Sequence, residues 1–271
     1  MTVLAGACEH GRLFVAFRGG HAVVFVQHFT LPEELLLLAH DPEEGRVLGR
    51  PHVLRLGLAG ALAAELMLAG RVTVHEGRIT AVGGPPLGDL ALDAALTRLA
   101  GRRKGQKLPR WVRDTAGLKT TAGRPDEVWR NRLVTRGALR EARTRSLVVI
   151  AQRRHPVGPD DRTTPARERV AAVAHGASTD ERARLLAALV GATGLARHVL
   201  PGDEEFRPRN ELADAARHDP IARCVRDLVL ESQGPAPRPR NGAEPIAEGT
   251  GWNPLDWIFG GNGDGGDGGG D

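Results

Sequence analysis

The sequence contains very little cysteine and no tyrosine. Cys8 and Cys224, the only two cysteines in 271 residues, allow no disulfide framework and no CxxC metal knuckle, a usage typical of a reducing, cytoplasmic compartment. No uninterrupted apolar run approaches the ~20 residues that a membrane span needs, and residues 1–30 lack the charged-then-apolar order of a signal peptide. We therefore expect a globular protein of one or two domains that neither spans a membrane nor is secreted.

Sequence signatures of catalysis are missing as well. Only three serines are present, none of them in a GxSxG nucleophile elbow, and no lysine follows a glycine-rich loop of the Walker type. The ten histidines form no HExxH sequence and no pair spaced four residues apart. We therefore expect no enzymatic activity, no metal site and no cofactor.

Positive charge is concentrated in one part of the chain. The overall net charge is only +4, and just 3 of the 37 basic residues are lysines. Residues 98–155, however, contain 17 Arg and Lys against 4 Asp and Glu, a net charge of +13, so the rest of the chain carries −9. A cationic segment on an acidic body predicts a polyanionic partner, either an anionic membrane surface or a nucleic acid.

The hydrophobic pattern predicts a mainly α fold. Apolar residues nearly all round the segment 54–69 indicate a buried central helix. Other helices are expected near 30–39, 88–99, 165–174, 179–199 and 208–231, the last broken at Asp219-Pro220. A helix end, a glycine and a β-hairpin occur twice, first at Gly70 with a turn at Glu76-Gly77 and again at Gly137. The expected architecture is a central helical bundle with two helix–β-hairpin units, winged-helix-like in outline.

Composition divides the chain into three segments. Residues 1–29 contain two β-rich runs around Gly19-Gly20 and are expected to form an N-terminal β-hairpin extension. Residues 30–233 carry the helical domain. Residues 234–271 are rich in Pro, Gly and Asp and cannot bury much apolar surface, so we expect a disordered tail.

The second hairpin, over residues 139–155, contains four apolar residues in a row between groups of arginines. The residues expected to contact a membrane are Arg143, Arg145, Leu147, Val148, Val149, Ile150, Arg153 and Arg154. A strand with one buried face should alternate, whereas an apolar run fenced by arginines suits insertion into a lipid interface. The alternative is that protein covers both faces of this strand, and the sequence leaves the two interpretations open.

The tail contains half of the four tryptophans, within Trp252–Phe259. This apolar group is a possible anchor for a membrane or for a protein partner. A strap packed back onto the body is slightly favoured, because exposed aromatic side chains are costly.

Five motifs follow one another along residues 30–232. They are Leu31–Ala39, Gly57–Gly60 with Glu65–Arg71, Pro86–Asp89 with Leu92–Leu96, Leu133–Leu139, and His155-Pro156. In these motifs the chain resembles the Golgi phosphoprotein 3 family, in particular its bacterial, actinobacterial-type members. The resemblance implies a mostly helical fold around a central bundle, and a peripheral membrane protein that binds phosphatidylinositol 4-phosphate. It also implies a β-hairpin that enters the bilayer, here residues 139–155, and, in eukaryotes, an adaptor for Golgi glycosyltransferases.

The headgroup pocket of that family is not kept residue by residue. Its tryptophan and arginine near the start of the central helix correspond to Arg50 and Ala59, and its arginine pair before the hairpin corresponds to Gly123 and Asp126. Basic residues close to those places remain able to bind a phosphate, because a planar guanidinium grips it with two hydrogen bonds. The residues expected to bind the lipid headgroup are Arg50, Arg55, Arg124 and Arg130.

The sequence thus predicts a non-enzymatic, cytoplasmic protein, peripherally associated with the inner face of a membrane through anionic phospholipid, and by resemblance through a phosphoinositide. One alternative is a winged-helix-like nucleic-acid-binding protein, in which the basic hairpin follows the phosphates. It is disfavoured because Asp126 and Glu127 begin the would-be recognition helix, where base and phosphate contacts are usually made. The other alternative is a protein–protein adaptor that uses residues 252–259.

Overall fold

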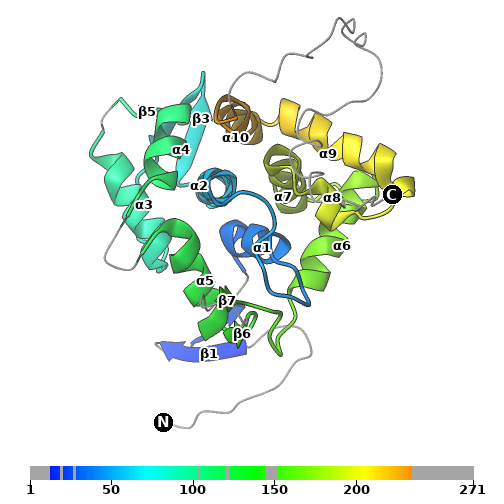
Figure 1. The fold of residues 1–271 in the computed structure, drawn as a ribbon. Helices are drawn as coiled ribbons and strands as arrows, with labels where there is room; N and C mark the ends of the chain where they lie inside the picture. The colour runs from blue at the N-terminus through cyan, green and yellow to red at the C-terminus, as the bar shows by residue number, and fades with distance from the viewer. Residues whose placement is uncertain are drawn as a thin grey trace, which may run out of the picture. The chain divides into compact units, whose positions relative to one another are not determined.

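The structure is a computed structural model that describes residues 13–18, 21–26, 29–102, 104–119, 123–144 and 152–233, apart from the side chains of 13–26, 143, 144, 152 and 153 (Figure 1). The chain divides into two units, residues 1–30 and 31–271. In the first unit, β1 (Leu13–Arg18) pairs antiparallel with β2 (His21–Val26), from Leu13 opposite Val26 to Arg18 opposite His21. The expected N-terminal hairpin is confirmed.

The second unit is mainly helical, as the hydrophobic pattern predicts. Its helices are α1 (Leu31–Leu38), α2 (Pro51–Leu68), α3 (Leu90–Ala100), α4 (Leu108–Ala116), α5 (Pro125–Thr135), α6 (Thr163–Ala174), α7 (Glu181–Thr193), α8 (Ala196–Val199), the 3-10 turn η1 (Asp203–Glu205), α9 (Phe206–His218) and α10 (Pro220–Glu231). Its strands are β3 (Val72–His75), β4 (Arg78–Ala81), β5 (Gln106–Lys107), β6 (Ala142–Thr144) and β7 (Gln152–Arg154). Strands β3, β4 and β5 form one antiparallel sheet, and β6 pairs with β7.

Helix α2 is the central helix of this unit. Figure 1 shows it almost end-on, with α1, α4, α5, α7 and α10 packed around it. The close approach depends on two glycines, because a Cβ at Gly57 would lie 2.5 Å from Thr193 Cγ2 and one at Gly60 would lie 2.4 Å from Val225 Cγ2. By length and composition α2 is the one described helix that meets the criteria for a membrane span, but 67% of it is buried inside the unit. We assign it to the core.

Local sequence signals explain where several elements begin and turn. Asp89 caps α3 by accepting hydrogen bonds from the N–H groups of Ala91 and Leu92, and Asp219 caps α10 in the same manner. Both glycines of the repeated helix–hairpin plan adopt the left-handed conformation, with φ of 66° at Gly70 and 77° at Gly137. The two-residue turn at Glu76-Gly77 also joins β3 to β4 as expected. Both helix–hairpin units are therefore confirmed.

The structure differs from the sequence-based expectations at two places among the helices. The helix expected over 179–199 is two helices, because Gly194 ends α7 with φ of 72° before α8 begins. Helix α4 was not expected, although its buried residues recur at helical spacing. Of the second hairpin strand the structure describes β7, and the predictions over residues 147–150 and for the tail 234–271 lie outside the described part of the chain.

The tightest helix contact gives a test of this packing. A Cβ at Gly191 in α7 would lie 2.1 Å from the backbone oxygen of Leu212 in α9, which no side-chain adjustment relieves. Gly191→Ala should therefore destabilise the protein by about 1–3 kcal/mol despite the better helix propensity of alanine, and lower the thermal midpoint by roughly 2–12 °C. Gly101→Ala is the matched control, since its nearest contact is at 3.9 Å. Equal midpoints for both variants would contradict the packing of α7 on α9.

Candidate anion-binding site

The four arginines predicted to bind a headgroup lie at the starts of two neighbouring helices. Arg50 and Arg124 are exposed at the N-caps of α2 and α5. Arg55 and Arg130 each lie in the second turn of the same helices, with side chains 19% and 16% exposed. Because α2 packs against α5, the fold brings Arg55 and Arg130 to one place.

Asp126, in the first turn of α5, lies between these two arginines. Its Oδ1 is 3.9 Å from Nη1 of Arg55, and its Oδ2 accepts a hydrogen bond of 3.3 Å from Nη2 of Arg130. Both distances exceed the ~2.7–2.9 Å of a good charge-assisted hydrogen bond. Within the described part of the chain, Oδ1 of Asp126 and Nε of Arg130 are buried without a hydrogen-bond partner. This Arg55–Asp126–Arg130 group therefore has unused bonding capacity.

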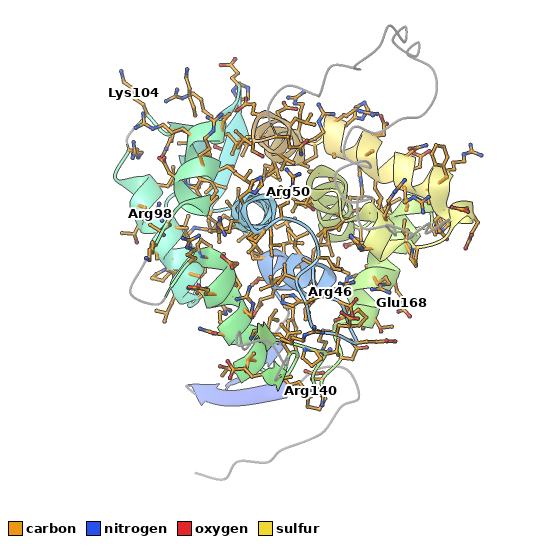
Figure 2. The ribbon with its side chains drawn as sticks, viewed as in Figure 1. Arg46, Arg50, Arg98, Lys104, Arg140 and Glu168 are labelled. Carbon is orange, nitrogen blue, oxygen red and sulfur yellow. The ribbon has the colours of Figure 1, made fainter. Side chains whose placement is uncertain are left out.

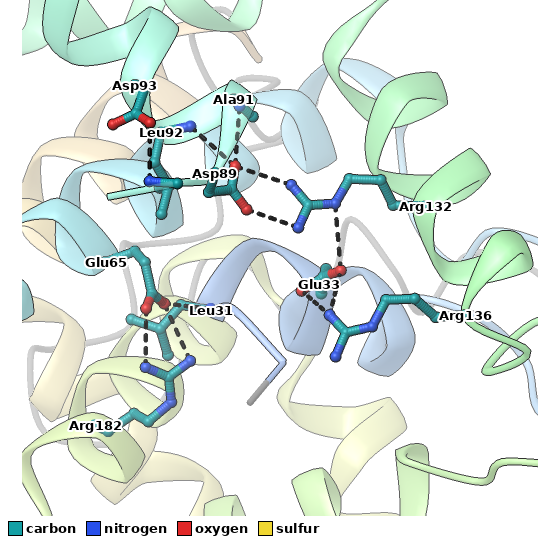
Figure 3. Close-up of polar contacts among 11 residues, drawn as sticks. Leu31, Glu33, Glu65, Asp89, Ala91, Leu92, Asp93, Arg132, Arg136 and Arg182 are labelled. Carbon is teal, nitrogen blue, oxygen red and sulfur yellow. Dashed lines mark hydrogen bonds and ion pairs between the residues drawn. The ribbon is translucent and has the colours of Figure 1, made fainter. Parts of the chain in front are cut away.

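Arg132 of α5 and Arg136, the C-cap residue of this helix, make shorter hydrogen bonds to carboxylates. Nη1 of Arg136 donates to both carboxylate oxygens of Glu33 at 2.9 Å, and Arg132 donates to both oxygens of Asp89 at 3.0 and 2.7 Å (Figure 3). Burial opposes the charge of Asp89, yet the hydrogen bond and the charge of Arg132 hold the pKa of its carboxyl below the usual value. These arginines tie α5 to α1 and α3, so their role is structural.

Hydrogen bonds of similar length connect a carboxylate of α2 to the start of α1 and to α7. Glu65 accepts hydrogen bonds of 3.1 and 3.0 Å from Arg182, and also one of 2.6 Å from the N–H of Leu31 (Figure 3). Compared with these pairs, the Arg55–Asp126–Arg130 group is loosely bonded. A ligand is best accommodated where buried polar atoms lack hydrogen bonds while the neighbouring groups are fully bonded.

The net charge of +13 in residues 98–155 is partly neutralised in the fold. Arg132 and Arg136 are used as described above, Arg113 forms an ion pair with Glu231, and Nη1 of Arg154 lies 3.5 Å from Glu44. These acidic partners come from outside the segment. The remaining charge is spread out, with Arg98 and Lys104 labelled beside α3 and Arg140 beside β6 and β7 in Figure 2.

Backbone hydrogen bonds hold the two ends of the hairpin predicted to enter the membrane, at Arg140 and His155. The N–H of His155 donates to the oxygen of Gly45 at 2.7 Å, and that of Arg140 donates to the oxygen of Pro156 at 3.0 Å. Of the predicted membrane-contacting side chains, only that of Arg154 is described. Outside the described part are the side chains of Arg143 and Arg153 and the whole of Arg145, Leu147, Val148, Val149 and Ile150. Insertion of the hairpin stays a prediction.

His40, a buried histidine that no sequence motif marks, lies close to His155 and to Arg130. The ring of His40 meets that of His155 edge-on, with centroids 6.2 Å apart. Its Nδ1 is 2.7 Å from the oxygen of Leu36, which can only accept, so Nδ1 carries the proton. Burial, together with the nearby charge of Arg130, lowers the pKa of His40 to about 4. The imidazole is therefore neutral, and within the described residues its buried Nε2 has no hydrogen-bond partner.

The larger of two cavities does not lie at the predicted arginines. One of about 360 Å³ lies between β4, the loop after it and α3, and Arg71, Asp93, Leu96 and Arg102 are among the residues that line it. Nη2 of Arg71 donates to the oxygen of Gly84 at 2.9 Å, so this guanidinium fixes the loop. The cavity beside Arg50 measures only about 10 Å³, too small for a phosphate group.

Groups suited to nucleophilic or metal chemistry are not gathered in the described residues. Burial raises the pKa of the Cys224 thiol to about 12, so this sulfur is protonated at neutral pH. Over the same residues, no three His, Cys, Asp or Glu side chains lie close enough together to hold a metal ion. The candidate site is therefore one of arginines.

Comparison with known proteins supports one family. The family model described as Golgi phosphoprotein 3 (GPP34) matches residues 31–232, which run from the first residue of α1 to just beyond the end of α10. No curated protein matches the chain. The family match covers most of the chain and agrees with the five motifs in the sequence. The chain belongs to the Golgi phosphoprotein 3 family.

Proposed function

We propose that this protein is a peripheral membrane protein that binds anionic phospholipid, and in particular a phosphoinositide, at the cytoplasmic face of a membrane. The observation that carries the proposal is the loosely bonded arginine pair, Arg55 and Arg130, in a member of the Golgi phosphoprotein 3 family. The role is binding rather than catalysis.

The arrangement of the four arginines suits a phosphate. The exposed Arg50 and Arg124 attract an anion from solution, and the largely buried Arg55 and Arg130 present guanidinium groups that bind phosphate with two hydrogen bonds each. All four belong to the first two turns of α2 and α5, where the helix dipoles also favour negative charge. Two guanidinium groups from neighbouring helices thus meet at Asp126, and the exposed arginines add positive charge at the starts of the same helices.

The nucleic-acid alternative receives less support from the same helix. Asp126 and Glu127 both lie in the first turn of α5, and the Glu127 carboxylate accepts a hydrogen bond of 2.8 Å from the N–H of Arg124. A recognition helix usually makes its base contacts at this end. The first turn of α5 thus presents carboxylates and no basic side chain to read a duplex, so the recognition-helix role receives less support.

Vesicle sedimentation tests the proposal, with a DNA gel shift run in parallel. The protein should sediment with phosphatidylcholine vesicles that contain anionic lipid and stay in the supernatant with phosphatidylcholine alone. Salt at about 0.5 M should weaken binding, because it shortens the Debye length to a few Å. Equal sedimentation with neutral vesicles, or a DNA shift without lipid binding, would overturn the proposal.

Loss of the two exposed arginines should separate headgroup recognition from general charge attraction. Arg50→Ala with Arg124→Ala should weaken binding to vesicles containing phosphatidylinositol 4-phosphate about 30-fold, at ~1 kcal/mol for the headgroup hydrogen bonds of each arginine. Binding to phosphatidylserine vesicles, which depends on surface charge alone, should weaken much less. Arg98→Ala with Arg102→Ala removes the same charge from exposed positions around the end of α3, so it should affect both lipids equally. An equal loss on both lipids from the first double variant would mean that no headgroup site exists there.

A further inference from the structure

We propose that Asp126 is a built-in competitor for the headgroup site, and that it makes the site selective for doubly charged phosphomonoesters over singly charged phosphodiesters. This inference rests on the proposed function, which it deepens. Asp126 is a specificity-determining residue because any anion that binds the arginine pair must take the place of its carboxylate.

The geometry places the carboxylate where a ligand phosphate would bind. Asp126 is the one carboxylate that forms ion pairs with both Arg55 and Arg130 in the described residues, and its side chain is only 13% exposed. The contacts, 3.9 Å and 3.3 Å, are nevertheless long. Within the described residues, the buried Oδ1 of Asp126 and the buried Nε of Arg130 have no hydrogen bond. The carboxylate thus occupies the position of an anion, but it does not use all the hydrogen-bond donors of the two arginines.

A displaced carboxylate has somewhere favourable to go. Asp126 is the second residue of α5, and the N-terminal end of a helix stabilises a negative side chain whether or not it faces the arginines. Turning away from Arg55 and Arg130 therefore costs Asp126 less than it would in the middle of a helix. The tightly bonded Glu33 and Asp89 have no comparable freedom, because both of their oxygens are already used by arginines.

Selectivity follows from counting the charges that are exchanged. A phosphodiester brings one negative charge, the same as the carboxylate that it replaces, so the exchange gains little. A phosphomonoester at neutral pH carries close to two negative charges and three acceptor oxygens, and it also reaches donors that Asp126 leaves unused, such as Nε of Arg130. The doubly charged ligand gains from the exchange, and the singly charged ligand does not.

The test is isothermal titration calorimetry of the full chain with two soluble probes, inositol 1-phosphate as the monoester and glycerophosphoinositol as the diester. The wild type should prefer the monoester. Asp126→Asn should bind the monoester about tenfold more tightly, equivalent to ~1.4 kcal/mol, and should gain still more for the diester, so that the preference narrows. Asp227→Asn is the matched control, since it makes the same charge change at a carboxylate that is 52% exposed on α10, and it should change neither affinity more than twofold.

Loss of Asp126 also removes a counter-charge from two largely buried arginines, so Asp126→Asn should melt at a lower temperature and recover more stability on adding the monoester than the wild type does. Asp126→Glu keeps the charge on a longer side chain and covers the case in which the asparagine variant does not fold. Its carboxylate reaches the arginines more closely, so it should weaken monoester binding at least threefold.

Vesicles distinguish a lipid headgroup from a free phosphate ester, and they also separate this inference from the proposed function. Stronger binding of Asp126→Asn to vesicles with phosphatidylinositol 4-phosphate and to the soluble probe supports a lipid source, and a gain on the soluble probe alone supports a free ester. If Asp126→Asn behaves like Asp227→Asn, or Asp126→Glu binds as the wild type does, the inference is overturned even though wild-type vesicle binding stands. If only the soluble probe responds and no vesicle binds, the inference stands and the proposed function fails.

Discussion

Replacing Glu33 by glutamine should destabilise the protein by about 3 kcal/mol or more and lower its thermal midpoint by roughly 6–12 °C. The Glu33 side chain is fully buried, and its carboxylate pairs with Arg136 at 2.9 Å and with Nε of Arg132 at 3.5 Å. The Arg136 side chain is only 20% exposed, so the substitution removes a carboxylate at 2.9 Å from a largely buried guanidinium. Thermal and urea denaturation measure the loss.

The matched control is Glu231→Gln, which makes the same substitution in an ion pair at the surface. Glu231 is 62% exposed and pairs with Arg113, so its removal should cost less than about 1 kcal/mol. If both variants unfold at the same midpoint, the contacts among Glu33, Arg132 and Arg136 do not hold α1 against α5, and these arginines would then become candidates for the anion site.

Much of the fold could be predicted because its signals are local. The break at Asp219-Pro220, the left-handed glycines and the turn at Glu76-Gly77 each act within a few residues, and the sequence identified each of them correctly. Helix α4 was missed although Leu108, Trp111, Val112 and Thr115 have the spacing of one helix face. Its strongly basic surroundings had been interpreted only as a charged segment.

The pairing of charges could not be predicted because it depends on contacts between distant parts of the chain. Glu33 and Arg136 are separated by 103 positions, and no local pattern marks them as partners. The sequence therefore treated all the basic residues of 98–155 as available to a ligand, whereas acidic residues from α1, the start of α3 and α10 neutralise several of them. What is available to a partner is smaller than the count of +13 suggests.

The candidate site, too, could be predicted from the sequence only in part. Arg55 and Arg130 were predicted from their places beside the family motifs, and the fold does bring them together. Asp126 was noted only as a carboxylate at a helix start and as a departure from the family pattern. Its position between the two arginines depends on the packing of α5 against α2, which single-sequence reasoning does not supply.

Replacing Val148 by aspartate should abolish binding to anionic vesicles, the largest functional effect expected from a single substitution. If the hairpin of residues 139–155 inserts into lipid, the new carboxylate costs ~2.5–3.5 kcal/mol at membrane depth and is repelled by the anionic surface as well. The melting temperature should change by less than about 2 °C, because in this interpretation the side chain faces water when the protein is free. Vesicle sedimentation measures the loss of binding, and thermal denaturation of the same preparation measures the melting temperature.

Val82→Asp is the control for charge alone. Val82 is 40% exposed in the loop after β4, so the same substitution there should leave both vesicle binding and the melting temperature nearly unchanged. If instead Val148 lies in a strand covered on both faces, an unpaired carboxylate is buried in protein and costs several kcal/mol, a large share of a total stability of ~5–15 kcal/mol. A midpoint lowered by more than about 10 °C, equivalent to ~3 kcal/mol for a domain of this size, would contradict insertion. The membrane contact would then rest on the arginines at the starts of α2 and α5, whose binding depends on salt and on headgroup charge rather than on apolar burial.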